Sequence, residues 1–271
     1  MGQPSILTKE EPWNLAVDGY AREAVPRLEP YAEEALQAAE LTRDSVVIDV
    51  ATGPGTLALK AAPRCREVVA VDFSPRMVNE LRRQCDALGY SNVLSAVADG
   101  QNLPSPDNSF DCAFSLFGLV FFEDRARGFR ELLRVLRPGG RAAVTSWEPF
   151  DRIEFMSELW GAVRTVMPNV PFGANQAPLG TPESFADEMR ASGFPKPNIV
   201  RLSHTWRYPS LAAAWDAFAK MTPPLVMLRH KMSGADWSGF EKGVTERLLK
   251  RFGSGPLAFE MVSLLGLGIK G

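Results

Sequence analysis

The chain has 271 residues, of which 45% are hydrophobic and 23% charged, and its formal net charge is −2. These values are ordinary for a globular protein with a buried core, and the length fits one large α/β domain, with or without a sizeable insertion. The balanced charge argues against a dominant nucleic-acid surface, which normally carries a basic excess. The few, widely spaced cysteines and histidines favour a reducing, cytoplasmic location and predict no metal site.

Apolar residues recur at helical spacing from Tyr20 to Leu41, so the chain is expected to begin with helix. Pro26 and Pro30 interrupt this pattern and predict either two short helices or one kinked helix. We therefore expect residues 1–44 to form an N-terminal helical cap segment.

An alternation of strands and helices follows over residues 45–150. Strands are predicted at 45–50, 68–71, 92–98, 110–114 and 141–145, with helices at 56–62, 74–88 and 125–136. This order is typical of a parallel sheet with right-handed crossovers and helices on both faces. Five arginines of the last helix and its end are expected to form a solvated face rather than a nucleic-acid patch: Arg125, Arg127, Arg130, Arg134 and Arg137.

The regular alternation of strands and helices does not continue in the last part of the chain, residues 151–271. Two further strands are predicted at 199–208 and 257–269, which would complete a Rossmann-like, mostly parallel sheet of seven strands. The stretch between them, 211–252, is largely helical and long for a simple connection. We expect it to form a helical lid over a pocket.

A glycine-rich turn follows the first strand, in the order Gly53-x-Gly55-x-x-Ala58. Glycine allows a sharp turn and a close approach of a ligand, and the following helix N-terminus presents unpaired N–H groups to an anion. That anion is either a pyrophosphate or the carboxylate of a methionine group. Turns of this kind also occur for purely structural reasons, so the pattern alone does not decide.

Three successive strand ends carry an acid, namely Asp49, Asp72 and Asp99. Together they predict a pocket for a ligand rich in hydroxyls and amines. Asp72 lies where a carboxylate accepts hydrogen bonds from a ribose, and the alternative is that it caps the next helix. Burying a carboxylate without partners is costly, so Asp49 is expected to meet backbone N–H groups or a ligand.

Asp99 is placed to accept a hydrogen bond from an adenine amine. Phe73 and Met77 are placed to sandwich the adenine ring, and the alternative for both is ordinary core packing.

Several stretches of the sequence resemble the motifs of class I S-adenosylmethionine-dependent methyltransferases. The matching stretches are 49–55, 69–74, 98–104, 107–111 and 131–140. The set is similar to the small-molecule branch related to ubiquinone and menaquinone biosynthesis methyltransferases, and it covers residues 45–147. One departure is Ala51, where the family usually has glycine; we expect alanine to adopt a β conformation there.

The resemblance implies that S-adenosylmethionine is the cofactor and S-adenosylhomocysteine the product. It implies that Asp72 holds the ribose, that Asp99 and Gly100 hold the adenine, and that Tyr20 closes over the cofactor. The full set of expected cofactor contacts is Tyr20, Asp49, Ala51, Thr52, Gly53, Asp72, Phe73, Met77, Asp99, Gly100, Gln101, Ser115 and Leu116.

The methyl acceptor is expected to be a small apolar or aromatic molecule, because aromatic residues cluster at the predicted mouth of the sheet and in the lid. The expected acceptor contacts are Trp13, Phe117, Trp147, Phe172 and Trp206. The alternative is that these rings attach the lid to the sheet. Methyl transfer is an in-line displacement, and the only candidate bases are His204, which also fits a core role, and His230.

Two other readings stay open. The glycine pattern permits an NAD(P)-dependent oxidoreductase, and the lack of an obvious base permits a cofactor-binding scaffold without catalysis. We expect the partner to be a small molecule rather than nucleic acid, with no membrane insertion and a monomeric or homodimeric state.

Overall fold

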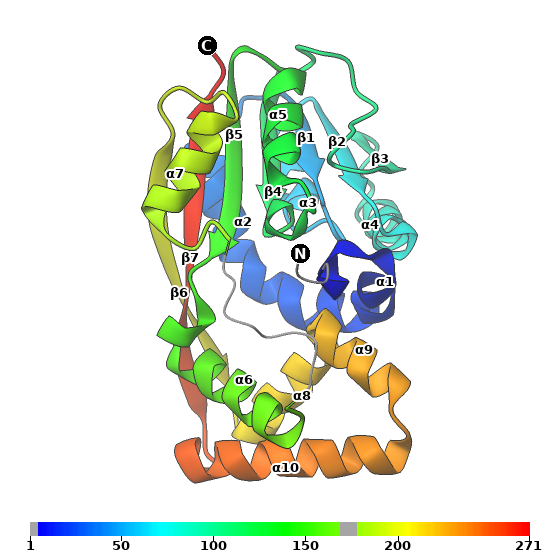
Figure 1. Cartoon of the computed structure of the whole chain (residues 1–271). Helices are drawn as coiled ribbons and strands as arrows, with labels where there is room; N and C mark the ends of the chain where they lie inside the picture. Colours follow the sequence, from blue (N-terminus) through cyan, green and yellow to red (C-terminus); the bar gives the residue numbers. More distant parts are fainter. Residues whose placement is uncertain (1–4, 169–177) are drawn as a thin grey trace. The chain divides into compact units, whose positions relative to one another are not determined.

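The computed structural model describes residues 5–168 and 178–271 (Figure 1). The strands in chain order are β1 (Val46–Val50), β2 (Glu67–Asp72), β3 (Val93–Val97), β4 (Phe110–Leu116), β5 (Leu136–Trp147), β6 (Asn198–Tyr208) and β7 (Leu257–Ile269). The α-helices are α1 (Glu10–Gly19), α2 (Val25–Ala38), α3 (Ala58–Ala61), α4 (Pro75–Leu88), α5 (Arg125–Val135), α6 (Glu154–Val166), α7 (Pro182–Ala191), α8 (Leu211–Met221), α9 (Pro223–Lys231) and α10 (Gly234–Phe252).

These elements cluster into two compact units, each assembled from separate stretches of the chain. The first unit comprises residues 1–27, 148–177 and 203–262, and the second comprises residues 28–147, 178–202 and 263–271. The three-part division expected from the sequence, at residues 44 and 150, stays a prediction.

The second unit is built on the sheet, whose strand order is β3-β2-β1-β4-β5-β7-β6. The pairs β2–β3, β1–β2, β1–β4 and β4–β5 are parallel, and β7 runs antiparallel to β5. The prediction of a seven-stranded, mostly parallel, Rossmann-like sheet is therefore confirmed. Because β1, β2, β3 and β4 run in the same direction, the loops that follow them all leave from one edge, which we call the carboxyl edge.

One face of this sheet is covered by α5 and α7. Phe129 of α5 and Phe185 of α7 belong to one buried cluster with the inward residues of the strands, among them Ile48 and Val144. Gly266 of β7 lets α7 approach closely, since a Cβ there would lie 2.7 Å from the Phe185 ring. The stretch from β3 to β4, residues 98–109, is fully described and contains no helix.

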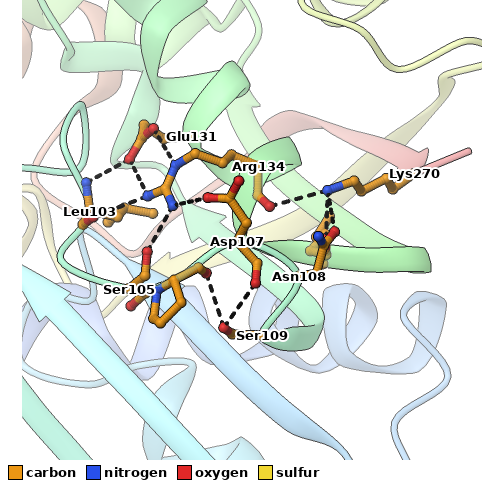
Figure 2. A network of polar contacts seen from close by, with 10 residues as sticks. Leu103, Ser105, Asp107, Asn108, Ser109, Glu131, Arg134 and Lys270 are labelled. Carbon is orange, nitrogen blue, oxygen red and sulfur yellow. Dashed lines mark hydrogen bonds and ion pairs between the residues drawn. The ribbon is translucent and has the colours of Figure 1, made fainter.

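That stretch is held instead by the Arg134 side chain of α5 (Figure 2). Its guanidinium donates to both carboxylate oxygens of Glu131 at 2.7 Å and to Asp107 at 2.7 Å. It also donates to the backbone carbonyls of Leu103 and Ser105, at 3.0 and 2.8 Å. One arginine thus satisfies four groups, because its planar fork offers five donors.

A second cation, Lys270, ties the end of the chain to the same region (Figure 2). Its ammonium donates to Asn108 Oδ1 and to the carbonyls of Arg134 and Leu136. The backbones of Gly139 and Gly140 also exchange hydrogen bonds with Lys270.

Strand β5 begins at Leu136, so the predicted start at residue 141 was wrong. The hydrogen bonds of Gly139 and Gly140 with Lys270 lie in this additional part of the strand. The Pro-Gly-Gly segment that usually marks a turn is instead paired with the chain end.

The arginines of α5 and its end are mostly engaged in ion pairs. Arg125 pairs with Glu188, Arg130 with Asp124, Arg134 with Glu131 and Asp107, and Arg137 with Asp111. Their charge is thus balanced by nearby acids, which does not favour a nucleic-acid patch.

The helix irregularity in the N-terminal region does not lie at the prolines, where the sequence predicted it. A π-helical segment, Tyr20–Ala24, joins α1 to α2. Pro26 follows closely on the π-helical segment, and Pro30 lies inside α2 without ending it. The irregularity therefore precedes both prolines.

The first unit has its own aromatic core. Its rings come from α6, α8, α10 and the outer parts of β6 and β7, and are Phe155, Trp206, Tyr208, Phe218, Phe252 and Phe259. Gly19 of α1 packs closely on α8, since a Cβ there would lie 2.1 Å from the Lys220 carbonyl oxygen. Across the residues that the structure describes, no helix is both long and apolar enough to cross a bilayer.

Candidate functional site

The loop after β1 turns through a run of left-handed backbone. Gly53 has φ +57° and Gly55 has φ +98°, conformations that glycine adopts without strain. Ala51 also has φ +57°. The expectation of a β conformation at Ala51 is therefore wrong: the chain must reverse at this position, and the alanine bears the steric cost that a glycine would avoid.

Asp72, the last residue of β2, binds this loop directly. Its Oδ2 accepts a hydrogen bond from the Gly53 N–H at 2.8 Å, and its Oδ1 accepts one from the Ser74 N–H at 2.8 Å. The cap of α4 is Ser74, whose Oγ accepts from the Met77 N–H, so Asp72 is not the capping residue. Burial raises the pKa of Asp72 to about 6, against the opposing effect of these N–H donors.

Asp49 lies one strand away and is almost fully buried. The Thr52 hydroxyl donates to its Oδ2 at 2.6 Å, and the Ala58 backbone N–H also donates to the carboxylate. Its Oδ1 has no hydrogen-bond partner among the described residues. Burial, reinforced slightly by the charge of Asp72, raises the pKa of Asp49 to about 7.

The end of β3 contributes a turn rather than a buried acid. Asp99 is exposed, and its Oδ1 accepts from the backbone and side-chain N–H groups of Gln101 at 2.8 and 3.1 Å. Gly100 is buried, and a Cβ there would lie 2.4 Å from the Phe122 ring and 2.7 Å from Val50. The residue at 100 must therefore be glycine for the loop to pack.

The end of β4 turns sharply at Phe117, which has φ +57°. The buried Ser115 hydroxyl accepts from the Leu119 N–H at 3.0 Å and closes the turn. The Phe117 ring stacks on Trp147, with centroids 4.0 Å apart and planes 12° apart, and Tyr31 meets both rings edge-on at 5.4 Å.

Thr145 and Tyr31 take part in this arrangement and were not expected from the sequence. Thr145 Oγ1 accepts from the Phe117 N–H at 2.9 Å. No motif marks a threonine in mid-strand, and Tyr31 was visible only as one apolar position of a helix.

The structure thus brings most of the expected cofactor residues to the carboxyl edge of the second unit. They are Asp49, Ala51, Thr52, Gly53, Asp72, Phe73, Asp99, Gly100, Gln101, Ser115 and Leu116. Met77 lies in the first turn of α4 and is 1% exposed, which equally fits core packing. Their contacts with a cofactor stay predictions.

Phe117 and Trp147 also lie in the second unit, and the remaining expected residues belong to the first. The part of all of them in the site stays a prediction. Trp13 and Tyr20 meet edge-on at 6.2 Å, and Trp206 is buried among aromatic rings. His204 is half-buried on β6, and His230 is exposed in the last turn of α9. Phe172 lies outside the described residues.

Comparison with known proteins identifies the region that carries this edge. Residues 47–140 match a family model described as a methyltransferase domain. A demethylmenaquinone methyltransferase of Thermus thermophilus is 42% identical over 105 residues, which are 38% of this chain and 47% of that protein. The matched part is thus less than half of the relative's length.

A demethylmenaquinone methyltransferase of Deinococcus radiodurans is 34% identical over 167 residues, which are 55% of this chain and 67% of that protein. Among solved structures, the YcgJ protein of Bacillus subtilis is similar with a TM-score of 0.59 at 19% identity, covering 88% of this chain and 97% of that one. The cyclase SpnF is similar with a TM-score of 0.55 at 20% identity, covering 90% and 82%. At such identities the structural likeness shows the fold alone.

These relatives give no support to the oxidoreductase alternative. The glycine loop, the acids at the strand ends and the sequence relatives agree, and the chain belongs to the S-adenosylmethionine-dependent methyltransferase family that includes the demethylmenaquinone methyltransferases.

Proposed function

We propose that this chain transfers a methyl group from S-adenosylmethionine to a small planar aromatic acceptor of the quinol class. The observation that carries the proposal is the hydrogen bond between Asp72 and Gly53, which joins the acid of β2 to the glycine loop of β1. The two elements that this family uses to hold the cofactor are thereby assembled as one unit.

The residues at the carboxyl edge fit such a cofactor. A Cβ placed on Gly53 would meet no atom within 4 Å, so the loop faces open space there. The Asp72 carboxylate accepts backbone hydrogen bonds from Gly53, Phe73 and Ser74, and its remaining acceptor capacity can serve a ribose hydroxyl. The buried, unpaired Oδ1 of Asp49 also fits a place that a polar ligand reaches.

When bound, the sulfonium group supplies a methyl carbon already activated for displacement. The protein's contribution is then to hold the reactants in line and to exclude water, which accounts for much of the acceleration in such reactions. Asp72 would position the ribose, and Gly53 would position the methionine end. His204 and His230 remain the candidate bases if the acceptor must lose a proton.

The choice of an aromatic acceptor is supported by the rings at the ends of β4 and β5. Phe117 and Trp147 form a flat stacked pair, and Trp147 is partly exposed. Planar rings stack favourably on such a surface. The sequence relatives named above act, by their names, on demethylmenaquinone. A cytoplasmic location and a monomeric or homodimeric state remain predictions.

The test is to incubate the protein with methyl-labelled S-adenosylmethionine and a panel of acceptors, followed by mass spectrometry. The panel contains 1,4-naphthohydroquinone, catechol and an aliphatic primary amine, and D72A is the matched control. We expect label in the naphthohydroquinone with the wild type only. Transfer to the amine alone would contradict the acceptor class, and no transfer to any acceptor would favour a non-catalytic scaffold.

A further inference from the structure

The backbone of Phe117 is held in a conformation that a residue of its type rarely adopts. Its φ of +57° places it in the left-handed region, where the Cβ of an L-residue crowds the backbone. Such a conformation persists only where the surroundings impose it. The question is which neighbours do so.

Three contacts restrain Phe117 within the second unit. Its N–H donates to Thr145 Oγ1 at 2.9 Å, its ring stacks on Trp147, and Tyr31 lies edge-on against that ring. Thr145 is 1% exposed, so no solvent replaces the hydroxyl if it is removed. Among the described residues, the hydroxyl of Thr145 is the side-chain acceptor for this N–H.

The turn at Phe117 also contacts the glycine loop. A Cβ on the next residue, Gly118, would lie only 2.3 Å from the Cβ of Ala51. The methyl group of Ala51 thus rests against the bare backbone of Gly118. Thr145 of β5, Phe117 and Gly118 after β4, and Ala51 after β1 form a chain of contacts across three neighbouring strands.

We propose that Thr145 is a positioning residue, which holds Phe117 in its left-handed conformation and thereby keeps both the ring and the adjoining glycine loop ready for ligands. The proposal rests on the proposed function for its relevance to methyl transfer. It does not depend on the identity of the acceptor, because Thr145 acts through the backbone of Phe117. The effect on the cofactor is transmitted by the contact between Gly118 and Ala51.

The test compares T145V, which has a similar shape but no acceptor, with T145S, which retains the hydroxyl. The matched control is S146A: Ser146 is the neighbouring buried residue on the opposite face of β5, and its hydroxyl donates to the Pro178 carbonyl at 3.0 Å. Two quantities are measured on the full-length chain. They are the near-ultraviolet circular dichroism of the free protein and the Kd for S-adenosylhomocysteine.

T145V is expected to lose the near-ultraviolet signal of the stacked rings and to bind S-adenosylhomocysteine about tenfold more weakly. The reason is that the relaxed turn must be restored before binding. T145S and S146A are expected to match the wild type in both measurements. Equal behaviour of T145V and S146A, or of T145V and T145S, would overturn the proposal.

If T145V alone does not fold, the F117G background keeps the test decisive. Glycine adopts the left-handed conformation without restraint, so T145V/F117G is expected to fold and to bind S-adenosylhomocysteine as F117G does. A further loss of affinity in the double variant would overturn the proposal. Neither measurement needs an acceptor. Failure of methyl transfer to 1,4-naphthohydroquinone would therefore refute the acceptor class without affecting the test of the role proposed for Thr145.

Discussion

The carboxylate of Asp72 and the backbone N–H of Gly53 are 2.8 Å apart, joining the end of β2 to the loop after β1. The second carboxylate oxygen binds the Ser74 N–H where α4 begins. Asp72 therefore organises the loop after β1. The same carboxylate is the group that we propose holds the ribose.

Substituting D72N should weaken both stability and cofactor binding. The amide nitrogen would face one of the backbone N–H donors from which the carboxylate now accepts, leaving a buried donor without an acceptor. We expect a loss of about 1–3 kcal/mol in the free energy of unfolding. We also expect at least about tenfold weaker S-adenosylhomocysteine binding. Urea unfolding and equilibrium dialysis measure the two effects. D107N, at an exposed acid on the loop before β4, is the control, and a D72N protein that binds like D107N would refute this role.

The buried acids predict an unusual dependence of stability on pH. Burial raises the pKa of Asp49 from 3.8 to about 7 and that of Asp72 to about 6. The folded chain therefore binds protons that the unfolded chain releases, and the contribution of these groups to stability falls as pH rises from about 4 to about 7. Above that window the contribution is constant.

D49N should remove the larger part of this dependence. The variant is expected to be more stable than the wild type near neutral pH and equally stable near pH 4, where both side chains are uncharged. Urea unfolding at several pH values gives the difference between the two proteins. A difference that stays constant across the window would show that Asp49 titrates normally.

The contact between Ala51 and Gly118 makes a double-mutant prediction. A51G relieves a left-handed alanine and should stabilise the chain by up to about 1 kcal/mol. G118A should destabilise it by about 1–3 kcal/mol, because the new Cβ would meet that of Ala51, although φ at 118 is −97° and permits alanine.

In A51G/G118A the clash is removed, so the two effects should couple by at least about 1 kcal/mol. Chemical denaturation of the four proteins of the cycle measures this coupling. If the two changes in the free energy of unfolding simply add, the contact between the Cβ atoms is not the reason that G118A destabilises the chain.

The Arg134 network predicts that lysine cannot replace this arginine (Figure 2). A lysine retains the charge but not the fork that reaches two carboxylates and two carbonyls, so R134K should cost about 1–3 kcal/mol. R190K, which changes an exposed pair with Asp187 on α7, should cost less than about 0.5 kcal/mol. Thermal unfolding of both variants checks the contrast, and equal losses would argue against the network.

Much of this fold could be predicted because the residues that mark the ends of helices and strands locally also fit the observed sheet. Ser74-Pro75 marked the start of α4, and the left-handed Gly89 marks its end. The limits of β7 were predicted to the residue. The βα alternation alone indicated the parallel sheet.

The misses came from interactions between residues far apart in the chain. The early start of β5 depends on Lys270, and the turn at Phe117 depends on a threonine of another strand. The predicted conformation of Ala51 was wrong because the prediction used the preference of alanine alone. It did not consider the reversal of the chain that the loop requires at this position.

Calorimetric titration of the wild-type chain with S-adenosylhomocysteine, with NAD as the comparison ligand, tests the central claim most directly. The carboxyl edge described here predicts saturable, one-to-one binding of the nucleoside and none of the dinucleotide. Absence of heat with S-adenosylhomocysteine, or tighter binding of NAD, would contradict it.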